Sequence, residues 1–330
     1  MIPSDTIYWL ALQDKRWILP TSVIEQFFNQ FHSLEQLWKA DFYSLSDLGL
    51  DEKTIANFLR YRSSVRFEGY ERLIRVLEKS NTNIFRYVDK EFPATLKDLG
   101  KSTEGPPLTL FHKGSFTDFN NCVAIVGTRD PSHFGHMMAR KLGRTIAKNG
   151  YTVVSGLARG TDTEAHCGAL EVPGGRTIAI LAWLNPVYPS ENTELSNDII
   201  ARGALLSESY DRPGSRLGKL DRAKFVQRNR VTSGISRCVI AIESGKEGGT
   251  VHQVRIALSQ GRKVFTVAPK SRNKRAIEGH KIFIEMGATA IKSAKPVLDF
   301  LRKSGSQTPY GEKRIDSFSR ESLLTFDKGD

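Results

Sequence analysis

The sequence predicts an α/β protein built on a doubly wound, mostly parallel β-sheet, preceded by a small all-helical domain. From residue 122 to about residue 303, short apolar runs rich in Val and Ile alternate with amphipathic helical stretches. Runs that are apolar at every position are typical of parallel strands buried on both faces. Residues 1–85, in contrast, carry apolar residues at helical spacing, with Thr21, Ser33 and Asp51 as expected helix N-caps.

Composition narrows the class of protein. The 330 residues carry 48 Lys+Arg against 36 Asp+Glu, a net charge of +12, with only three cysteines. Three scattered cysteines exclude a disulfide scaffold and argue against a zinc site, so we expect buried thiols and a cytoplasmic location. No run of 18 apolar residues occurs, so we expect no membrane span, and residues 1–17 make a poor signal peptide.

The helical part, residues 1–85, is the first expected domain. Within it, FYSLSDLGLDEKTIANFLRYR has a helix, Gly turn, helix pattern similar to SAM-like and helix-hairpin-helix modules, although simple helix packing explains the pattern equally well. Residues 86–121, punctuated by Pro and Gly, are expected to connect to the sheet and to belong with it to a second domain, 86–303. Residues 304–330 are polar and Ser-rich and are expected to form a mobile tail.

The loops after the expected strands are the candidate ligand site, because ligands of open α/β sheets bind beyond the carboxyl ends of the strands. The run CVAIV is followed by Gly127 and Arg129. The run YTVVSG ends with Ser155 and Gly156 and is followed by Arg159. Glycine allows a backbone to approach a phosphate, and arginine matches its geometry. These loops therefore predict a phosphate-binding edge, although plain strand–helix turns would use the same glycines. Neither a dinucleotide fingerprint nor a P-loop is present.

The candidate catalytic and metal-binding groups are weak. Asp162 and His166 share one helix face, which permits a metal or acid/base pair but is more often a capping Asp with a hydrogen-bonded His. His133 and His136 have no cysteine or second acid nearby. We therefore expect no catalytic residues, no metal and no cofactor.

Positive charge is concentrated in residues 212–237, with eight bases and one acid, and in residues 260–281, with seven bases and one acid. Such clusters indicate a polyanion-binding surface, although a solvated basic surface is an equal alternative. Phe225 lies among these bases, next to Arg222, Lys224, Arg228 and Arg230. An aromatic ring among cations suits single-stranded nucleic acid, because the ring stacks on any base. Alternatively, Phe225 packs in the core, and Arg228 and Arg230 pair with acids such as Glu208 and Glu243.

Taken together, the motifs resemble the DprA/Smf family of DNA-processing proteins. The motifs that carry the resemblance are FPxxLK (92–97), LFHKG (110–114), GTR (127–129), SGLARGTDxxAH (155–166), YPxxN (188–192), GxLLSE (203–208) and FxxRNR (225–230). The resemblance implies an extended Rossmann-like fold and no catalytic activity. It also implies binding and protection of single-stranded DNA, delivery to the RecA recombinase during natural transformation, and a homodimer. It assigns DNA contacts to Arg129, Arg222 or Lys224, Phe225, Arg228 and Arg230, and a pocket-shaping role to Gly127, Ser155 and Gly156.

Two other functions are compatible with parts of the sequence. The Gly248-Gly249-Thr250 loop loosely resembles the phosphoribohydrolases that cleave nucleoside monophosphates, for which Glu243 or Glu208 would supply the carboxylate. Against this, His252 and Gln253 follow where those enzymes place an acid. A helical adaptor with an inert Rossmann-like module would explain residues 1–85 but not the two basic clusters.

Overall fold

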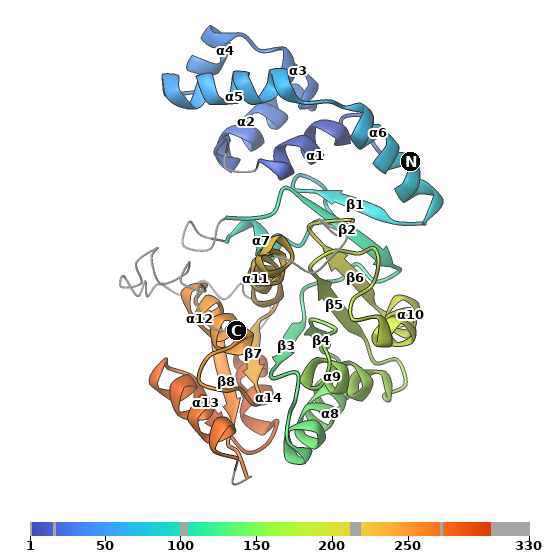
Figure 1. Cartoon of the computed structure of the whole chain (residues 1–330), viewed down its shortest axis with the longest axis vertical. Helices are drawn as coiled ribbons and strands as arrows, with labels where there is room; N and C mark the ends of the chain where they lie inside the picture. The colour runs from blue at the N-terminus through green and yellow to red at the C-terminus, as the bar shows by residue number, and fades with distance from the viewer. Residues whose placement is uncertain (1, 16–17, 100–104, 212–218, 271–272, 305–330) are drawn as a thin grey trace.

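A nine-stranded sheet forms the centre of the molecule, with the strand order β1-β2-β6-β5-β4-β3-β7-β8-β9 (Figure 1). The computed structural model describes residues 2–15, 18–99, 105–211, 219–270 and 273–304. The strands are β1 (Asn83–Arg86), β2 (Thr109–Gly114), β3 (Cys122–Val126), β4 (Thr152–Ser155), β5 (Thr177–Leu181), β6 (Ala204–Ser207), β7 (Cys238–Ala241), β8 (Lys263–Val267) and β9 (Thr289–Ile291). The predicted doubly wound, mostly parallel sheet is confirmed, since only the pairs β1–β2 and β2–β6 are antiparallel among the described strands.

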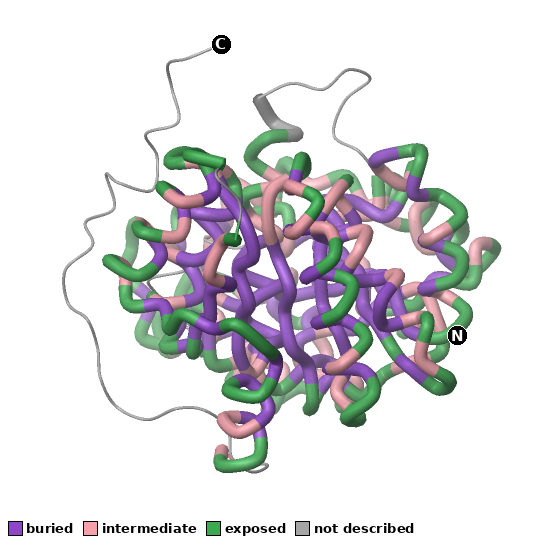
Figure 2. Tube along the Cα trace, turned by 90° about the horizontal axis from the view of Figure 1, so that it is seen from below, coloured by how far each residue is buried: buried purple, intermediate pink, exposed green. Residues whose placement is uncertain are grey.

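The sheet differs from the prediction at both edges. Residues 86–121, expected as a connector, contain strand β2, and β1 ends at Arg86, across the expected domain boundary. The short strand β9 also had no counterpart among the predicted strands. All three lie outside the six central strands, whose continuous burial gave the apolar signal (Figure 2).

Helices cover both faces of the sheet because successive residues of each buried strand point to opposite sides. Val123 and Ile125 pack against α8, α9 and α14, whereas Ala124 and Val126 pack against α12 and α13. Helix α11 packs beside α12 on the second face, and α10 covers β5 and β6 on the first. These helices are α8 (His133–Lys148), α9 (Thr161–Leu170), α10 (Thr193–Arg202), α11 (Lys219–Gly234), α12 (Gly249–Ser259), α13 (Lys274–Glu285) and α14 (Lys295–Lys303).

The described residues between positions 2 and 79 are mostly helical, as predicted, and lie beyond the β1–β2 edge of the sheet (Figure 1). The helices are α1 (Thr6–Asp14), α2 (Thr21–Phe31), α3 (Glu35–Lys39), α4 (Phe42–Ser46), α5 (Glu52–Ser64) and α6 (Glu68–Lys79), and α7 (Ala94–Lys97) follows β1. Of the predicted caps, Asp51 is confirmed, since its carboxylate accepts the Thr54 N–H at 2.9 Å. Thr21 is instead the first helical residue of α2. Ser33 lies one residue before Leu34, the N-cap position of α3, and its hydroxyl accepts the Glu35 N–H.

The helical part and the sheet share one apolar core. Trp9 and Phe58 belong to the same buried cluster as Ile180 of β5 and Val231 of α11. The side chain of Gln13 adds polar contacts, since its carbonyl oxygen accepts the backbone N–H groups of residues 108 and 109 at 2.7 and 3.2 Å. The two parts therefore hold a fixed mutual orientation. Within the described ranges, no helix is long and apolar enough to cross a bilayer. The expected tail, residues 305–330, lies outside the described residues.

Candidate nucleic-acid interface

The ring of Phe225 lies at the centre of an aromatic and cationic cluster at the carboxyl edge of the sheet. Phe225 projects from α11 and is half-buried. Its ring centroid is 5.2 Å from that of Trp183 and 5.8 Å from that of Tyr188, both in the loop after β5. The guanidinium carbons of Arg129 and Arg228 lie 5.7 and 5.9 Å from the same centroid. The ring is thus neither sealed in the core nor isolated on the surface.

A shallow depression opens beside this ring. Its lining residues are Arg129, Gly156, Ala158, Arg159, Tyr188, Pro189 and Phe225. These residues follow strands β3, β4 and β5, or lie on α11, so the depression borders the point where the order of the parallel strands reverses between β3 and β7. Its volume is about 60 Å³, far below the several hundred Å³ typical of an enclosed small-molecule site. The geometry favours an open contact with part of a larger ligand.

Arg228 lies next to the Phe225 ring and is not a free surface cation. Its Nη1 donates to the carbonyl oxygens of Gly156 at 2.5 Å and Ile180 at 2.8 Å. Burial lowers the pKa of Arg228, and the nearby Asp162 carboxylate opposes this shift. Asp162 in turn accepts the N–H groups of Gly156 at 3.1 Å and Ala158 at 3.3 Å. The Gly156 backbone is therefore held on both sides, and its N–H is not available to a phosphate.

Gly156 is required by close packing. A Cβ at this position would lie 2.1 Å from Arg228 Nη1, well inside van der Waals contact. Gly127 is restricted in the same way, because a Cβ there would lie 2.5 Å from Oγ1 of Thr161 at the start of α9. At both glycines the space that a Cβ would occupy is taken by a side chain of this protein, and their predicted role in shaping a phosphate pocket stays a prediction.

The remaining predicted cations differ in exposure. Arg129 and Arg222 are exposed and Lys224 is half-buried, the last two within one turn of Phe225 on α11. Arg159 is also exposed and forms an ion pair with Glu191, which raises the pKa of Arg159. Exposed ion pairs of this kind contribute little stability, so Arg159 can exchange its partner for a phosphate.

Two predicted site residues lie in the core, which corrects their expected position on the edge. Ser155 is fully buried, and its hydroxyl donates to the carbonyl of Ile125 at 2.6 Å. Arg230 is 2% exposed, pairs with Glu208 and donates to the Gly105 carbonyl at 2.6 Å. The alternative of pairing with an acid therefore holds for Arg230, because a charge inside the protein needs a close counter-charge.

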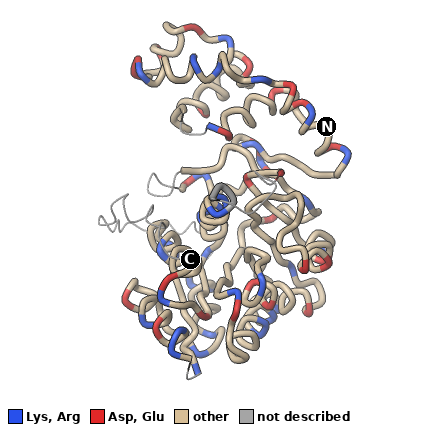
Figure 3. The backbone as a smooth tube through the Cα atoms, viewed as in Figure 1, with Lys and Arg blue, Asp and Glu red and all other residues tan. Residues whose placement is uncertain are grey.

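The two basic clusters do not converge fully on one edge, contrary to expectation. Arg237, Arg262 and Lys263 lie immediately before or at the start of β7 and β8, at the amino edge of the sheet. Arg262 is also buried, where it donates to the Gly234 carbonyl at 2.7 Å. Figure 3 shows Lys and Arg on α8 and α13 as well as on α11. Cations that precede a parallel strand and those that follow it lie at opposite ends of the strand.

Asp162 and His166 do not form a metal or acid/base pair. Asp162 binds the N–H groups of the Gly156 loop and lies inside the first turn of α9, where Gly160 is the N-cap residue. His166 Nδ1 lies 2.6 Å from Thr177 Oγ1, which itself donates to the Val153 carbonyl. The Thr177 oxygen must then accept a hydrogen bond from Nδ1–H, while the buried Nε2 has no partner among the described residues. Burial lowers the pKa of His166 to about 3, so the ring is neutral. In the part of the chain that the structure describes, no group of three or more potential ligands could hold a metal ion.

Sequence reasoning did not include two aromatic residues of the site. Trp183 is 2% exposed and supports Phe225 from below, and Tyr188 lines the depression. Their signal was their position in the loop after a predicted strand, the same signal that identified Arg129 and Arg159.

Comparisons with known proteins identify the family and the fold of this chain. A family model for DNA recombination-mediator protein A matches residues 83–302. The chain is 32% identical over 306 residues to protein Smf of Synechocystis, covering 90% of this chain and 73% of that protein. It is 33% identical over 244 residues to the DNA processing protein DprA of Bacillus subtilis, covering 72% and 78%.

Two solved structures share the fold. The chain superposes on DprA of Streptococcus pneumoniae with a TM-score of 0.68 at 27% identity, covering 91% of this chain and 98% of that one. It superposes on DprA of Helicobacter pylori with a TM-score of 0.57 at 26% identity, covering 68% and 96%. The latter structure concerns the single-stranded DNA binding mode of that protein. The match over two thirds of the sequence, the extended Rossmann-like sheet and the curated relatives lead to one conclusion: the chain belongs to the DNA recombination-mediator protein A family, that of the DprA and Smf proteins.

Proposed function

We propose that this protein binds single-stranded DNA at the carboxyl edge of its sheet, with Phe225 as the stacking residue. The observation that carries the proposal is the half-buried Phe225 ring flanked by the guanidinium groups of Arg129 and Arg228, beside an open depression. A partly exposed ring with cations close by can stack on a base while the cations hold the backbone. Arg129, Arg159, Arg222 and Lys224 supply the phosphate contacts in this proposal.

The roles of the core residues follow from their contacts. Arg228 holds the Gly156 loop in place beneath the bound strand, and Ser155 and Arg230 are not among the proposed DNA contacts. A sequence-tolerant interface results, because the stacking face and the cations have no hydrogen-bonding pattern that selects one base.

We further propose that the protein is not an enzyme. The two carboxylates that a phosphoribohydrolase would need are already engaged in buried contacts. Glu243 accepts the Ser132 N–H at 2.8 Å and the Ser132 hydroxyl at 2.6 Å, and Glu208 pairs with Arg230. A test for free-base release from a panel of nucleoside monophosphates addresses this alternative, and release would overturn the non-catalytic assignment.

The cellular role is also proposed from the family. A protein that binds DNA strands without base preference can protect incoming strands and pass them to the RecA recombinase during natural transformation. We propose this role, in the cytoplasm and as a homodimer. Co-purification of RecA with the DNA-loaded protein and the mass of the free protein in solution test the two partners separately.

The decisive experiment is a titration with single- and double-stranded oligonucleotides at about 50 mM and about 200 mM salt. We expect preference for the single strand and affinity that falls steeply with salt. Phe225→Leu keeps an apolar side chain against Trp183 but removes the stacking ring, and is expected to weaken binding about 5- to 100-fold. Arg129→Ala is expected to weaken binding as well. The matched control is Lys148→Ala, which removes an exposed cation at the end of α8, at the amino edge of the sheet. If Phe225→Leu and Arg129→Ala both bind like the parent, the proposed site is wrong.

A further inference from the structure

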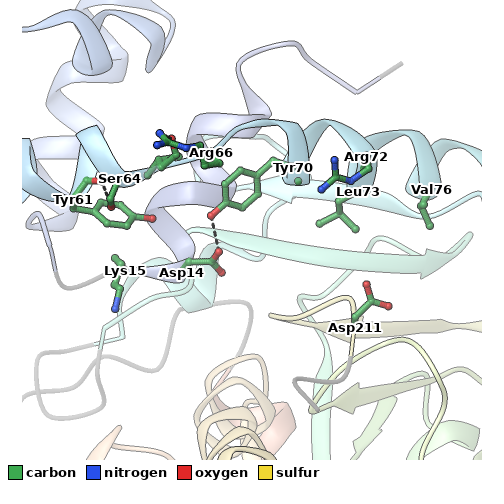
Figure 4. A pocket seen from close by; sticks show the side chains of 12 residues that line it. Asp14, Lys15, Tyr61, Ser64, Arg66, Tyr70, Arg72, Leu73, Val76 and Asp211 are labelled. Carbon is green, nitrogen blue, oxygen red and sulfur yellow. Dashed lines mark hydrogen bonds between the residues drawn. The ribbon is translucent and has the colours of Figure 1, made fainter. Parts of the chain in front are cut away.

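A second, larger cavity lies between the helical part and the loop that follows β6. Its volume is about 640 Å³, and it lies between α1, α5 and α6 on one side and Asp211 on the other (Figure 4). Its lining includes the cations Lys15, Arg66 and Arg72, the aromatic residues Tyr61 and Tyr70, and the carboxylate of Asp14. Figure 4 shows Asp211 across the cavity from Leu73 and Val76 of α6. None of these residues takes part in the site around Phe225.

The cations of this cavity are free, whereas its carboxylates are engaged. Lys15 and Arg72 make no hydrogen bond or ion pair with any described residue, and Arg66 reaches only the carbonyl of its neighbour Val65, at 3.5 Å. Asp14 accepts the Tyr70 hydroxyl at 2.6 Å, and Asp211 accepts the Asn185 amide at 3.0 Å. An anionic ligand would therefore meet three uncommitted cations and two carboxylates whose charge is partly satisfied.

The cavity also offers aromatic and apolar surface. Tyr61 and Tyr70 are each half-buried, with hydroxyls that donate to Ala11 O at 2.6 Å and to Asp14. Burial, strengthened by Asp14, raises the pKa of both tyrosines, so neither adds negative charge. Val76, 46% exposed, extends the apolar face along α6. Rings, apolar side chains and free cations in one cavity suit a polymer that carries both bases and phosphates.

The cavity is connected to the Phe225 site by one short segment. The backbone of residues 184–185 pairs with that of residues 209–211, through Leu184 N–H to Ser209 O at 3.1 Å and Asn185 N–H to Tyr210 O at 2.7 Å. The same segment continues to Tyr188, which lines the depression beside Phe225. Asp211 at one end of this pairing lines the larger cavity. Tyr188 at the depression and Asp211 at the larger cavity thus belong to two segments that pair with each other.

We infer that the cavity between α1, α5, α6 and Asp211 is a second contact site for the same single-stranded DNA, beyond the Phe225 site. This inference rests on the proposed function. Arg66, Arg72 and Lys15 hold phosphates there, and Tyr70 provides a stacking surface. Strands too short to span both sites use only the Phe225 site, whereas longer strands use both.

The test compares oligothymidylates of about six and about twenty-four nucleotides by fluorescence anisotropy over a salt series. The variant carries Arg66→Ala and Arg72→Ala, both exposed residues, and is expected to fold normally. It is expected to bind the short strand like the parent and the long strand about tenfold more weakly. For the long strand, loss of two phosphate contacts is expected to reduce the slope of log K against log salt by about 1.4. The matched control carries Lys53→Ala and Arg60→Ala, exposed cations of α5 outside the cavity.

A second variant removes the ring and keeps all three cations of the cavity. Tyr70→Ala is expected to weaken the long strand at least fivefold with the salt slope unchanged, and to leave the short strand unaffected. If the double arginine variant and its control bind the long strand equally, the second contact site is refuted while the Phe225 site stands. If the parent binds neither strand, the proposed function itself fails. If the cavity binds a protein partner and not DNA, the double arginine variant and its control will bind the long strand equally, and this result would overturn the inference.

Discussion

Replacing Gly156 by Ala tests whether the Arg228 side chain holds the loop beneath the proposed DNA site. A Cβ on Gly156 would lie 2.1 Å from Nη1 and 2.3 Å from Cζ of Arg228. Non-bonded carbon atoms are ordinarily about 3.5 Å or more from their neighbours, so the Arg228 guanidinium must move by about 1 Å. It then loses its bonds to the carbonyls of Gly156 and Ile180, and Asp162 loses part of its compensating charge.

The expected cost follows from these bonds. Each hydrogen bond from a charged donor contributes about 1.5–3 kcal/mol, so loss of most of this pair destabilises the protein by about 3 kcal/mol or more. Gly156 does not have a positive φ, so alanine introduces no backbone strain of its own. Urea unfolding measures the change, and Gly249→Ala, at a position with nothing within 4 Å of the new Cβ, is the control with a small expected effect.

A double-mutant cycle separates the clash from other causes. Arg228→Ala alone is expected to be destabilising, since two carbonyls lose their donor. In that background Gly156→Ala is expected to cost less than about 1 kcal/mol, giving a coupling of about 2 kcal/mol or more. If the two effects simply add, the contact between Gly156 and Arg228 does not explain the need for glycine, and Arg228 does not hold the loop in the way proposed.

Three further predictions concern stability. The pKa of His166 is near 6.5 in the unfolded state and about 3 in the folded state, so the neutral ring contributes about 4–5 kcal/mol to the free energy of unfolding above pH 6.5. This contribution is lost as the pH falls towards 3. His166→Asn is therefore expected to flatten the acid limb of a stability–pH curve, and an unchanged limb would contradict the prediction. Arg230→Met leaves Glu208 buried without its partner and is expected to cost about 3–5 kcal/mol in urea unfolding, while the folded variant still binds a short oligonucleotide; a normal stability would show that the pair is not structural. Gly143→Ala places a Cβ 2.3 Å from a backbone carbonyl oxygen of α9 and is expected to lower the midpoint of thermal unfolding. Gly69→Ala in α6, where the new Cβ meets open space, is expected to stabilise the protein by about 0.5–1 kcal/mol. Equal effects of the two substitutions would refute the packing argument.

The central strands were predictable because each is an apolar run between turn residues. The strands β1 and β2 were not, because they pair antiparallel at the edge and contain polar residues such as Asn83 and Lys113. The strand β9 spans three residues, two of them exposed, which leaves no periodic signal. Edge strands take their stability from pairing with the sheet, and a local pattern does not reveal a distant partner.

The site shows the same division between local and distant information. Arg129, Arg159 and Phe225 were predictable because position after a strand, or among bases on a helix, is visible in the sequence. The burial of Arg230 was left open, because its partner Glu208 lies 22 residues away on a different element. Ser155 was assigned to the pocket as a small residue in a glycine turn, yet it is the last residue of β4 and faces inward.

Helix α11 is anchored at two points, by Arg228 to Gly156 after β4 and Ile180 in β5, and by Arg230 to Glu208. These contacts tie α11 to the sheet and help to set the position of Phe225 before any ligand arrives. A pre-organised ring spares an incoming strand the entropic penalty of ordering the receptor, so the gain from stacking is retained as affinity. The buried arginines would thus assist recognition by immobilising the helix that carries the stacking residue.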